Sequence, residues 1–332
     1  MQQLPTLAQG QPQREFAGAV PTAAPRSASR RRGLLPTEEG IRSSRLAVLL
    51  VLALVASSSV PWYASLGLAV QWATGVPVAA ATVLMFVLHW RLSIAPRTLA
   101  DRAIADTLLV ACFILLATNL GAPAQYLAVA LRRPLIDHWL AAADASLGID
   151  VGRLAAWTAS HPLVAVVLQF AYSSLLPQFL GALLLLGLLY KDRARLWEYC
   201  FHFHFCLLLT LAGLALFPAA CAFQFLDFDS VLPQQRFIAH FNGVRDGSFT
   251  TIRLDDLEGL ISMPSFHVAG GLMVTWVFRG YRRPFVLLLV LNSLMIASTF
   301  MTGAHYFVDV LSTLVMFGLS VGVYRAMTHS GR

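Results

Sequence analysis

Two histidines and one acid in the C-terminal third of the chain have the types and spacing needed for nucleophilic or acid–base chemistry. His305 and Asp309 lie four residues apart in the apolar stretch MTGAHYFVDVL, and His267 ends the stretch GLISMPSFH. Residues at i and i+4 share one helix face, so Asp309 can accept a hydrogen bond from one imidazole nitrogen of His305. That bond fixes the tautomer and makes the other nitrogen a better nucleophile or base.

The elements that position these residues are predicted to be membrane helices. The chain has 332 residues, of which 57% are hydrophobic and 12% charged, whereas a soluble domain carries about 25% charged residues. Apolar stretches of about 20 residues, long enough to cross a bilayer as a helix, recur along the chain. We therefore predict an all-α polytopic bundle that is integral to the cell (inner) membrane, with the bilayer and not a nucleic acid as its partner.

We expect about eight spans, and seven is the alternative because the Ser-, Pro- and Gly-containing segment 57–76 makes the first turn ambiguous. Residues 1–45 are rich in Pro, Ala, Ser and Arg and predict a disordered basic tail. Residues 46–130 then hold the N-terminal transmembrane helices. The eight spans are expected at 46–64, 69–89, 104–130, 162–190, 197–222, 266–280, 284–303 and 305–325.

The distribution of basic residues predicts the orientation. If both termini are cytoplasmic, all but six of the 24 Lys and Arg residues lie on the inner side, as the positive-inside rule requires. The net charge of +7 is thus explained without a nucleic-acid partner. His267 and His305 then begin the sixth and eighth spans at the outer face. The six outer residues are Arg132, Arg133, Arg153, Arg236, Arg245 and Arg253.

Two outer segments are long enough to have structure of their own. Residues 132–161 place apolar side chains at helical spacing, with Asp137 and Asp144 on the other face, which predicts an extracytoplasmic interfacial helix with a wet acidic face. Residues 223–265 form a polar outer loop above the two histidines.

The two histidine motifs resemble those of a known family. SMPSFHVA (262–269) and STFMTGAHYFVD (298–309) are similar to the second and third signature motifs of the type-2 phosphatidic acid phosphatase superfamily, roughly P-S-G-H and S-R-x5-H-x3-D. The H-Y-x2-D form, with LIDHWLAAADASLG, FAYSSLLPQ and GVRDG, resembles the bacterial inositol phosphorylceramide synthase-like (inositolphosphotransferase) branch. The resemblance implies a phosphatase- or phosphotransferase-like membrane domain over residues 131–328, built on a core six-helix bundle and working without a cofactor or metal.

The resemblance also implies roles for single residues. His305 would be the nucleophile that forms a phosphohistidine, and Asp309 would orient and activate it. His267 would protonate the leaving alcohol and later activate water or an acceptor alcohol. Ser265 would hydrogen-bond the phosphoryl oxygens of a lipid phosphate or diphosphate.

The cationic positions of the family pattern are occupied differently in this chain. Thr299 stands where the third motif usually has arginine, and the first motif, K-x6-R-P, is absent. The cations that bind phosphate must therefore come from elsewhere. The outer loop offers Arg245 as the first candidate, Arg253 as the second and Arg236 as the third.

The leading hypothesis is a lipid phosphatase or phosphotransferase that acts at the extracytoplasmic face. Three other functions fit parts of the pattern. One alternative is a synthase that transfers the phosphoryl-containing group to inositol or another alcohol. Two histidines and one aspartate also match a two-His, one-carboxylate metal site. The last alternative is a non-catalytic transporter or scaffold with a degenerate site.

Overall fold

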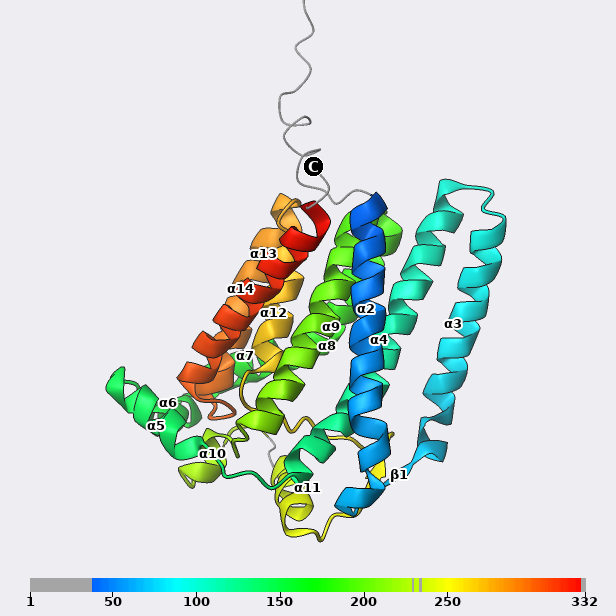
Figure 1. Cartoon of the computed structure of the whole chain (residues 1–332). Coiled ribbons are helices and arrows are strands. Elements are labelled where there is room, and N and C mark those ends of the chain that lie inside the picture. The colour runs from blue at the N-terminus through cyan, green and yellow to red at the C-terminus, as the bar shows by residue number, and fades with distance from the viewer. Residues whose placement is uncertain (1–37, 229, 233–234, 330–332) are drawn as a thin grey trace, which may run out of the picture. The chain divides into compact units, whose positions relative to one another are not determined.

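The computed structural model describes residues 38–228, 230–232 and 235–329, which form a helical bundle with shorter elements gathered at one end (Figure 1). The bundle helices are α2 (Glu38–Ser59), α3 (Val76–Ile94), α4 (Leu99–Ala130), α8 (Leu175–Leu184), α9 (Arg193–Leu216), α12 (Phe266–Val277), α13 (Arg282–Met301) and α14 (Phe307–His329). The elements at one end are α5 (Asp137–Ser146), α6 (Val151–Ala159), α7 (Pro162–Ser173), α10 (Ala222–Phe225), α11 (Gln235–Asp246), β1 (Ala69–Gln71) and β2 (Thr251–Arg253).

The predicted all-α polytopic membrane bundle is confirmed. Within the described residues, six helices are long and apolar enough to cross a membrane: α2 extended through Trp62, α3 with the turn before it, α4, α9, α13 and α14. The expected sixth span is the shorter apolar helix α12. A bent pair, α6 with α7, would raise the count to seven if it formed one span.

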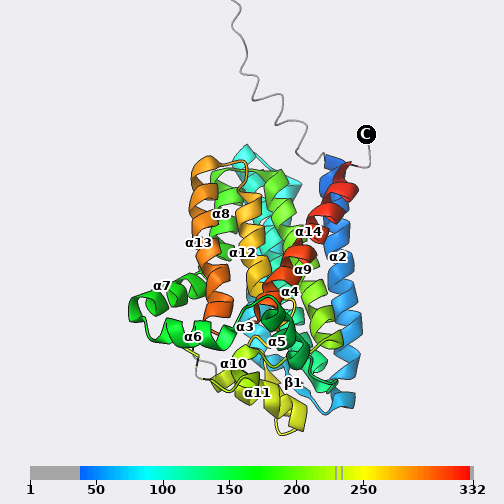
Figure 2. The ribbon, with the colours of Figure 1, turned by 90° about the vertical axis from the view of Figure 1, so that its left-hand side faces the viewer.

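The segment expected as the fourth span, 162–190, is not one helix. It breaks at Ser174 into α7 and α8, and α8 ends in a π-helical turn, Leu185–Leu189. Pro177 explains the break, because proline has no N–H to donate to Ser173 and its ring clashes with that carbonyl in a continuous helix. α6 and α7 meet at an angle of 112° and project from the side of the bundle (Figure 2).

The N-terminal boundaries also differ from the expected ones. Residues 38–45, expected in the tail, form the first two turns of α2, and residues 1–37 lie outside the described residues. Residues 69–75, expected in the second span, form β1 and a short 3₁₀ turn, and α3 starts at Val76 with Pro77 in its first turn. Proline is favoured there because its missing N–H would be unpaired anyway.

Helix α9 is the centre of the bundle. It packs against α2, α4, α12 and α14, and its large side chains Trp197, Tyr199 and Phe201 are fully buried. Helix α3 packs mainly on α4 and has no buried residue. The core therefore lies around α9, and α3 lies at the edge (Figure 1).

Helix α5 turns its acidic face inward, and the expected wet face is wrong. The Asp137 and Asp144 side chains are buried, while Trp139 is 68% exposed. The acids are buried because each accepts hydrogen bonds from backbone N–H groups of other elements. Such bonds offset part of the penalty for burying a carboxylate.

Candidate active site

His305 lies in the turn that joins α13 to α14. α14 starts at Phe307, so His305 precedes the helix that we expected it to begin. The His305 backbone N–H donates to the Thr299 carbonyl at 2.9 Å. Gly303 makes this turn possible, because its φ is +79° and an added Cβ would lie 2.4 Å from Phe228 ring atoms.

The two ring nitrogens of His305 face different partners. Nδ1 lies 3.4 Å from Asp309 Oδ2, and Nε2 lies 3.1 Å from the Ser265 hydroxyl oxygen. That hydroxyl oxygen accepts the Val268 N–H as the N-cap of α12, so its own proton is free to point at Nε2. We assign the imidazole proton to Nδ1, facing Asp309, and the lone pair to Nε2.

Asp309 is the hub of a buried polar network. Its Oδ2 accepts hydrogen bonds from the Ser262 hydroxyl at 3.2 Å and from the Tyr306 N–H at 3.1 Å. Its backbone carbonyl accepts the Thr313 hydroxyl, and the oxygen of that hydroxyl accepts the Ser265 N–H at 2.9 Å. These bonds join α14 to the loop before α12, so the two histidine motifs are held together by more than one contact.

His267 lies in the first turn of α12 and stacks on Tyr172, with ring centroids 4.3 Å apart and planes 12° apart. His267 and His305 both line a cavity of about 390 Å³. Its wall also contains Gln125, Cys221 and Glu258. The cavity therefore presents two imidazoles to one volume beside the N-terminus of a helix, which favours an anion.

The structure brings together four of the six predicted site residues: His305, His267, Asp309 and Ser265. Arg253 is paired with Asp255 at 2.9 Å. Arg245 donates to the Arg133 carbonyl at 3.1 Å. Neither lines the cavity, and none of the residues described in its wall is Lys or Arg.

Arg236 comes nearest to the cavity through its contacts. It pairs with Asp256 at 2.6 Å and with Glu258 at 3.3 Å, and Glu258 belongs to the cavity wall. Over the described part of the chain, no group of three or more His, Cys, Asp and Glu side chains is arranged to hold a metal ion.

Two acids of α5, which sequence reasoning treated as solvent-facing, hold the start of α14. Asp144 accepts the N–H groups of Phe307 and Val308, both at 2.9 Å. Asp137 accepts the Tyr306 hydroxyl at 3.0 Å and the Ala220 N–H. Residues seven apart share a helix face. Two acids at that spacing on an otherwise apolar segment were the sequence feature that could have indicated a shared role for Asp137 and Asp144.

Burial raises the pKa of both α5 carboxyls, against the lowering effect of the hydrogen bonds that they accept. Arg245 is close enough to Asp137 to lower its pKa as well. Arg245 is thereby placed near Asp137. It belongs to the support of the turn and not to the cavity wall.

Comparison with known protein families identifies the family of the chain. A family model described as the PAP2 superfamily matches residues 138–323, more than half of the chain, and the match contains both histidines, Ser265 and Asp309. No curated protein and no solved structure gives a significant match. Membership in this superfamily indicates a phosphatase or phosphotransferase that acts on lipid phosphates. The chain belongs to the PAP2 superfamily.

Proposed function

We propose that the protein transfers or hydrolyses the phosphoryl group of a membrane lipid phosphate or diphosphate through a phosphohistidine at His305. The observation that carries this proposal is the fixed His305 ring, which lies between Ser265 and Asp309 on the wall of the cavity it shares with His267. A histidine in a cavity wall, with Nδ1 beside a carboxylate and Nε2 carrying the lone pair, has the arrangement of an activated nucleophile.

In the first step, His305 Nε2 attacks phosphorus. The N–P bond forms as the P–O bond to the lipid alcohol breaks, and His267 gives a proton to the leaving oxygen. Asp309 stabilises the positive charge that appears on the His305 ring. In the second step, His267 takes a proton from water or an acceptor alcohol, whose oxygen attacks phosphorus and releases His305.

Phosphate binding in this arrangement depends on the residues at the start of α12. The Ser265 hydroxyl can turn from Nε2 to a phosphoryl oxygen once the N–P bond forms, and backbone N–H groups at the helix N-terminus attract the anion. Arg236 can reach the cavity by leaving Glu258. A role for Arg245 or Arg253 requires a movement of the outer loop that brings these side chains to the cavity.

We further propose the transferase chemistry of the inositol phosphorylceramide synthase-like branch, with inositol or a similar alcohol as acceptor. Thr299 supports this assignment, because it occupies the position of the usual arginine and is buried with its carbonyl bonded to His305. The asymmetry of basic residues supports cytoplasmic termini and a cavity at the extracytoplasmic face of the inner membrane.

The test is to incubate the purified protein with labelled lipid phosphates and diphosphates, with and without inositol or glycerol. Label in water-soluble phosphate indicates hydrolysis, and label on the alcohol indicates transfer. We expect His305→Ala to lower either rate at least about 10³-fold and to abolish acid-labile protein labelling.

Two additions separate this proposal from the alternatives. Activity should persist in a strong chelator, and vanadate, which mimics the transferring phosphoryl group, should inhibit it. Unchanged turnover in His305→Ala would overturn the nucleophile assignment. A protein that binds no vanadate and turns over no lipid phosphate would instead indicate a transporter or scaffold.

A further inference from the structure

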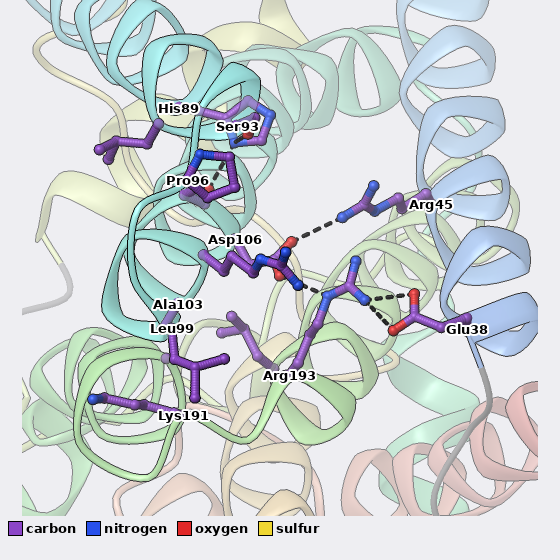
Figure 3. Close-up of a pocket in the computed structure, with 15 residues that line it drawn as sticks. Glu38, Arg45, His89, Ser93, Pro96, Leu99, Ala103, Asp106, Lys191 and Arg193 are labelled. Atoms are coloured by element: carbon purple, nitrogen blue, oxygen red, sulfur yellow. Dashed lines mark hydrogen bonds and ion pairs between the residues drawn. The ribbon is translucent and has the colours of Figure 1, made fainter.

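A second cavity, of about 790 Å³, lies at the opposite end of the bundle from the histidines. It is lined by the C-terminal end of α3, the N-terminal ends of α4 and α9, the first turns of α2 and the π-helical turn after α8 (Figure 3). Nothing in the proposed reaction uses this cavity. Its wall carries the cations that the histidine cavity lacks.

The charges on the wall do not cancel. Arg193 contacts both Glu38 and Asp106, and Arg45 contacts Asp106 at 2.8 Å. These contacts match two acids with two arginines, and the dashed lines in Figure 3 show the chain of ion pairs.

Two further cations on the wall, Arg102 and Lys191, are exposed. Neither has an acidic partner among the described residues. The wall therefore has an excess of two positive charges facing one volume, which favours an anion.

The backbone around the cavity has a close helix contact at Gly187 and a positive φ at Lys191. Gly187 of the π-helical turn lies so close to α4 that an added Cβ would be 2.1 Å from the Thr107 hydroxyl oxygen. Lys191, which follows the turn, has a left-handed backbone with φ of 51°, a conformation that non-glycine residues adopt in only a few per cent of cases.

The apolar part of the wall continues onto the lipid-facing surface. Leu92, Pro96 and Leu99 line the cavity, and Leu99 is 78% exposed. Beside them, Ile94 is 64% exposed and Leu189 is 66% exposed. The ligand that fits a cationic wall with an apolar rim is an amphiphile whose anionic head enters the cavity while its chains lie along α3, α4 and α8.

We propose that this cavity binds a phosphate-bearing anion, and that its source is the headgroup of an anionic lipid in the membrane leaflet at this end of the bundle. Arg102 and Lys191 provide the attraction, and the Arg45–Asp106–Arg193–Glu38 chain fixes the wall. A lipid headgroup with an uncompensated negative charge is attracted by each nearby Lys or Arg. A zwitterionic headgroup lacks that net attraction. The site is independent of the proposed reaction.

The test is native mass spectrometry of the full-length protein, titrated with phosphatidylglycerol, phosphatidylcholine of the same chains, or inorganic phosphate. We expect preferential binding of phosphatidylglycerol, and a loss of about tenfold in its affinity when Arg102→Gln and Lys191→Gln are combined. The matched control combines Arg282→Gln and Arg283→Gln. It removes the same charge from exposed residues at the same end of the bundle, outside the cavity wall.

A second variant keeps the charges and fills the space. Ala103→Trp places an indole in the cavity and should lower phosphatidylglycerol binding without changing the net charge. Competition by inorganic phosphate would support the site and identify the free anion as a sufficient ligand. Equal binding of the two lipids, unchanged binding in both cavity variants, or an equal loss in the control would overturn the proposal.

Discussion

The cavities at the two ends of the bundle differ in the charged side chains that line them. The wall of the cavity at His305 contains two imidazoles and one acid, Glu258, whereas Asp309 is buried beside the His305 ring and does not line the cavity. The cavity at the other end exposes four cationic side chains to its volume. The difference shows that reactivity here depends on orientation by buried hydrogen bonds. Attraction of an anion depends on unpaired charge near the surface, where a cation keeps much of its hydration.

Substitution of one acid at each end should give the largest difference in kcat. Asp309→Asn should lower kcat about 10²–10⁴-fold, because the amide no longer fixes the proton on His305 Nδ1. Asp106→Asn, which removes a partly buried acid from the opposite cavity, should leave kcat within about twofold. Turnover of labelled lipid phosphate measures both. Equal losses in the two variants would show that Asp309 acts through general stability.

Substitution of one glycine at each end compares how backbone strain near each cavity affects stability and turnover. Gly303→Ala should cost about 2–4 kcal/mol, because it combines a left-handed φ with contact against Phe228, and it should also reduce turnover. Gly187→Ala should cost about 1–3 kcal/mol through contact with Thr107 and leave turnover unchanged.

Thermal unfolding and turnover are measured together for both glycine variants. Thr107→Ala should restore the stability of Gly187→Ala, because it removes the contacting hydroxyl. A failure of that rescue would contradict the assigned contact.

The support of the histidine turn by α5 gives a smaller effect. Asp144→Asn should lower stability by about 1–2 kcal/mol and kcat about tenfold, since it weakens the bonds to Phe307 and Val308. Asp150→Asn is the matched control, because Asp150 caps α6 at the Arg153 N–H and is exposed. A positioning role predicts a lower kcat with an unchanged KM in Asp144→Asn only. A change in KM alone would contradict it.

The smallest expected effect is the loss of stability at low pH through His240 on α11. Burial lowers the pKa of His240 on α11, Arg236 lowers it further, and Glu258 and Asp256 oppose both. Because folding favours the neutral ring, its contribution is present above the unfolded pKa of about 6.5 and is lost as the pH falls through the lower folded pKa. Wild type should therefore lose more thermal stability between pH 7.5 and pH 5 than His240→Gln. An equal loss would show that protonation of His240 does not lower the stability of the fold at low pH.

The local features of the site could be predicted from the sequence. Apolar stretches long enough to span a bilayer predict membrane helices, since each satisfies its backbone hydrogen bonds within itself. The i, i+4 spacing of His305 and Asp309 likewise placed the acid beside the ring, although α14 starts only at Phe307. The motif around Ser265 and His267 predicted the second half of the site. These features depend on neighbouring residues along the chain.

The tertiary structure decided what lies opposite those residues. Asp144 and Phe307 are separated by 163 positions, so no local pattern pairs them, and an amphipathic helix looks the same whether its acids meet water or backbone N–H groups. Arg245 and Arg253 have partners outside the histidine cavity, the Arg133 carbonyl and Asp255, and Arg236 reaches its wall only through Glu258. The cationic cavity is formed by residues from α2, α3, α4, α9 and a π-helical turn, and it exists only once those segments pack. Hydropathy and spacing along one helix are local properties, whereas compensation of a buried charge depends on whichever segment folds against it.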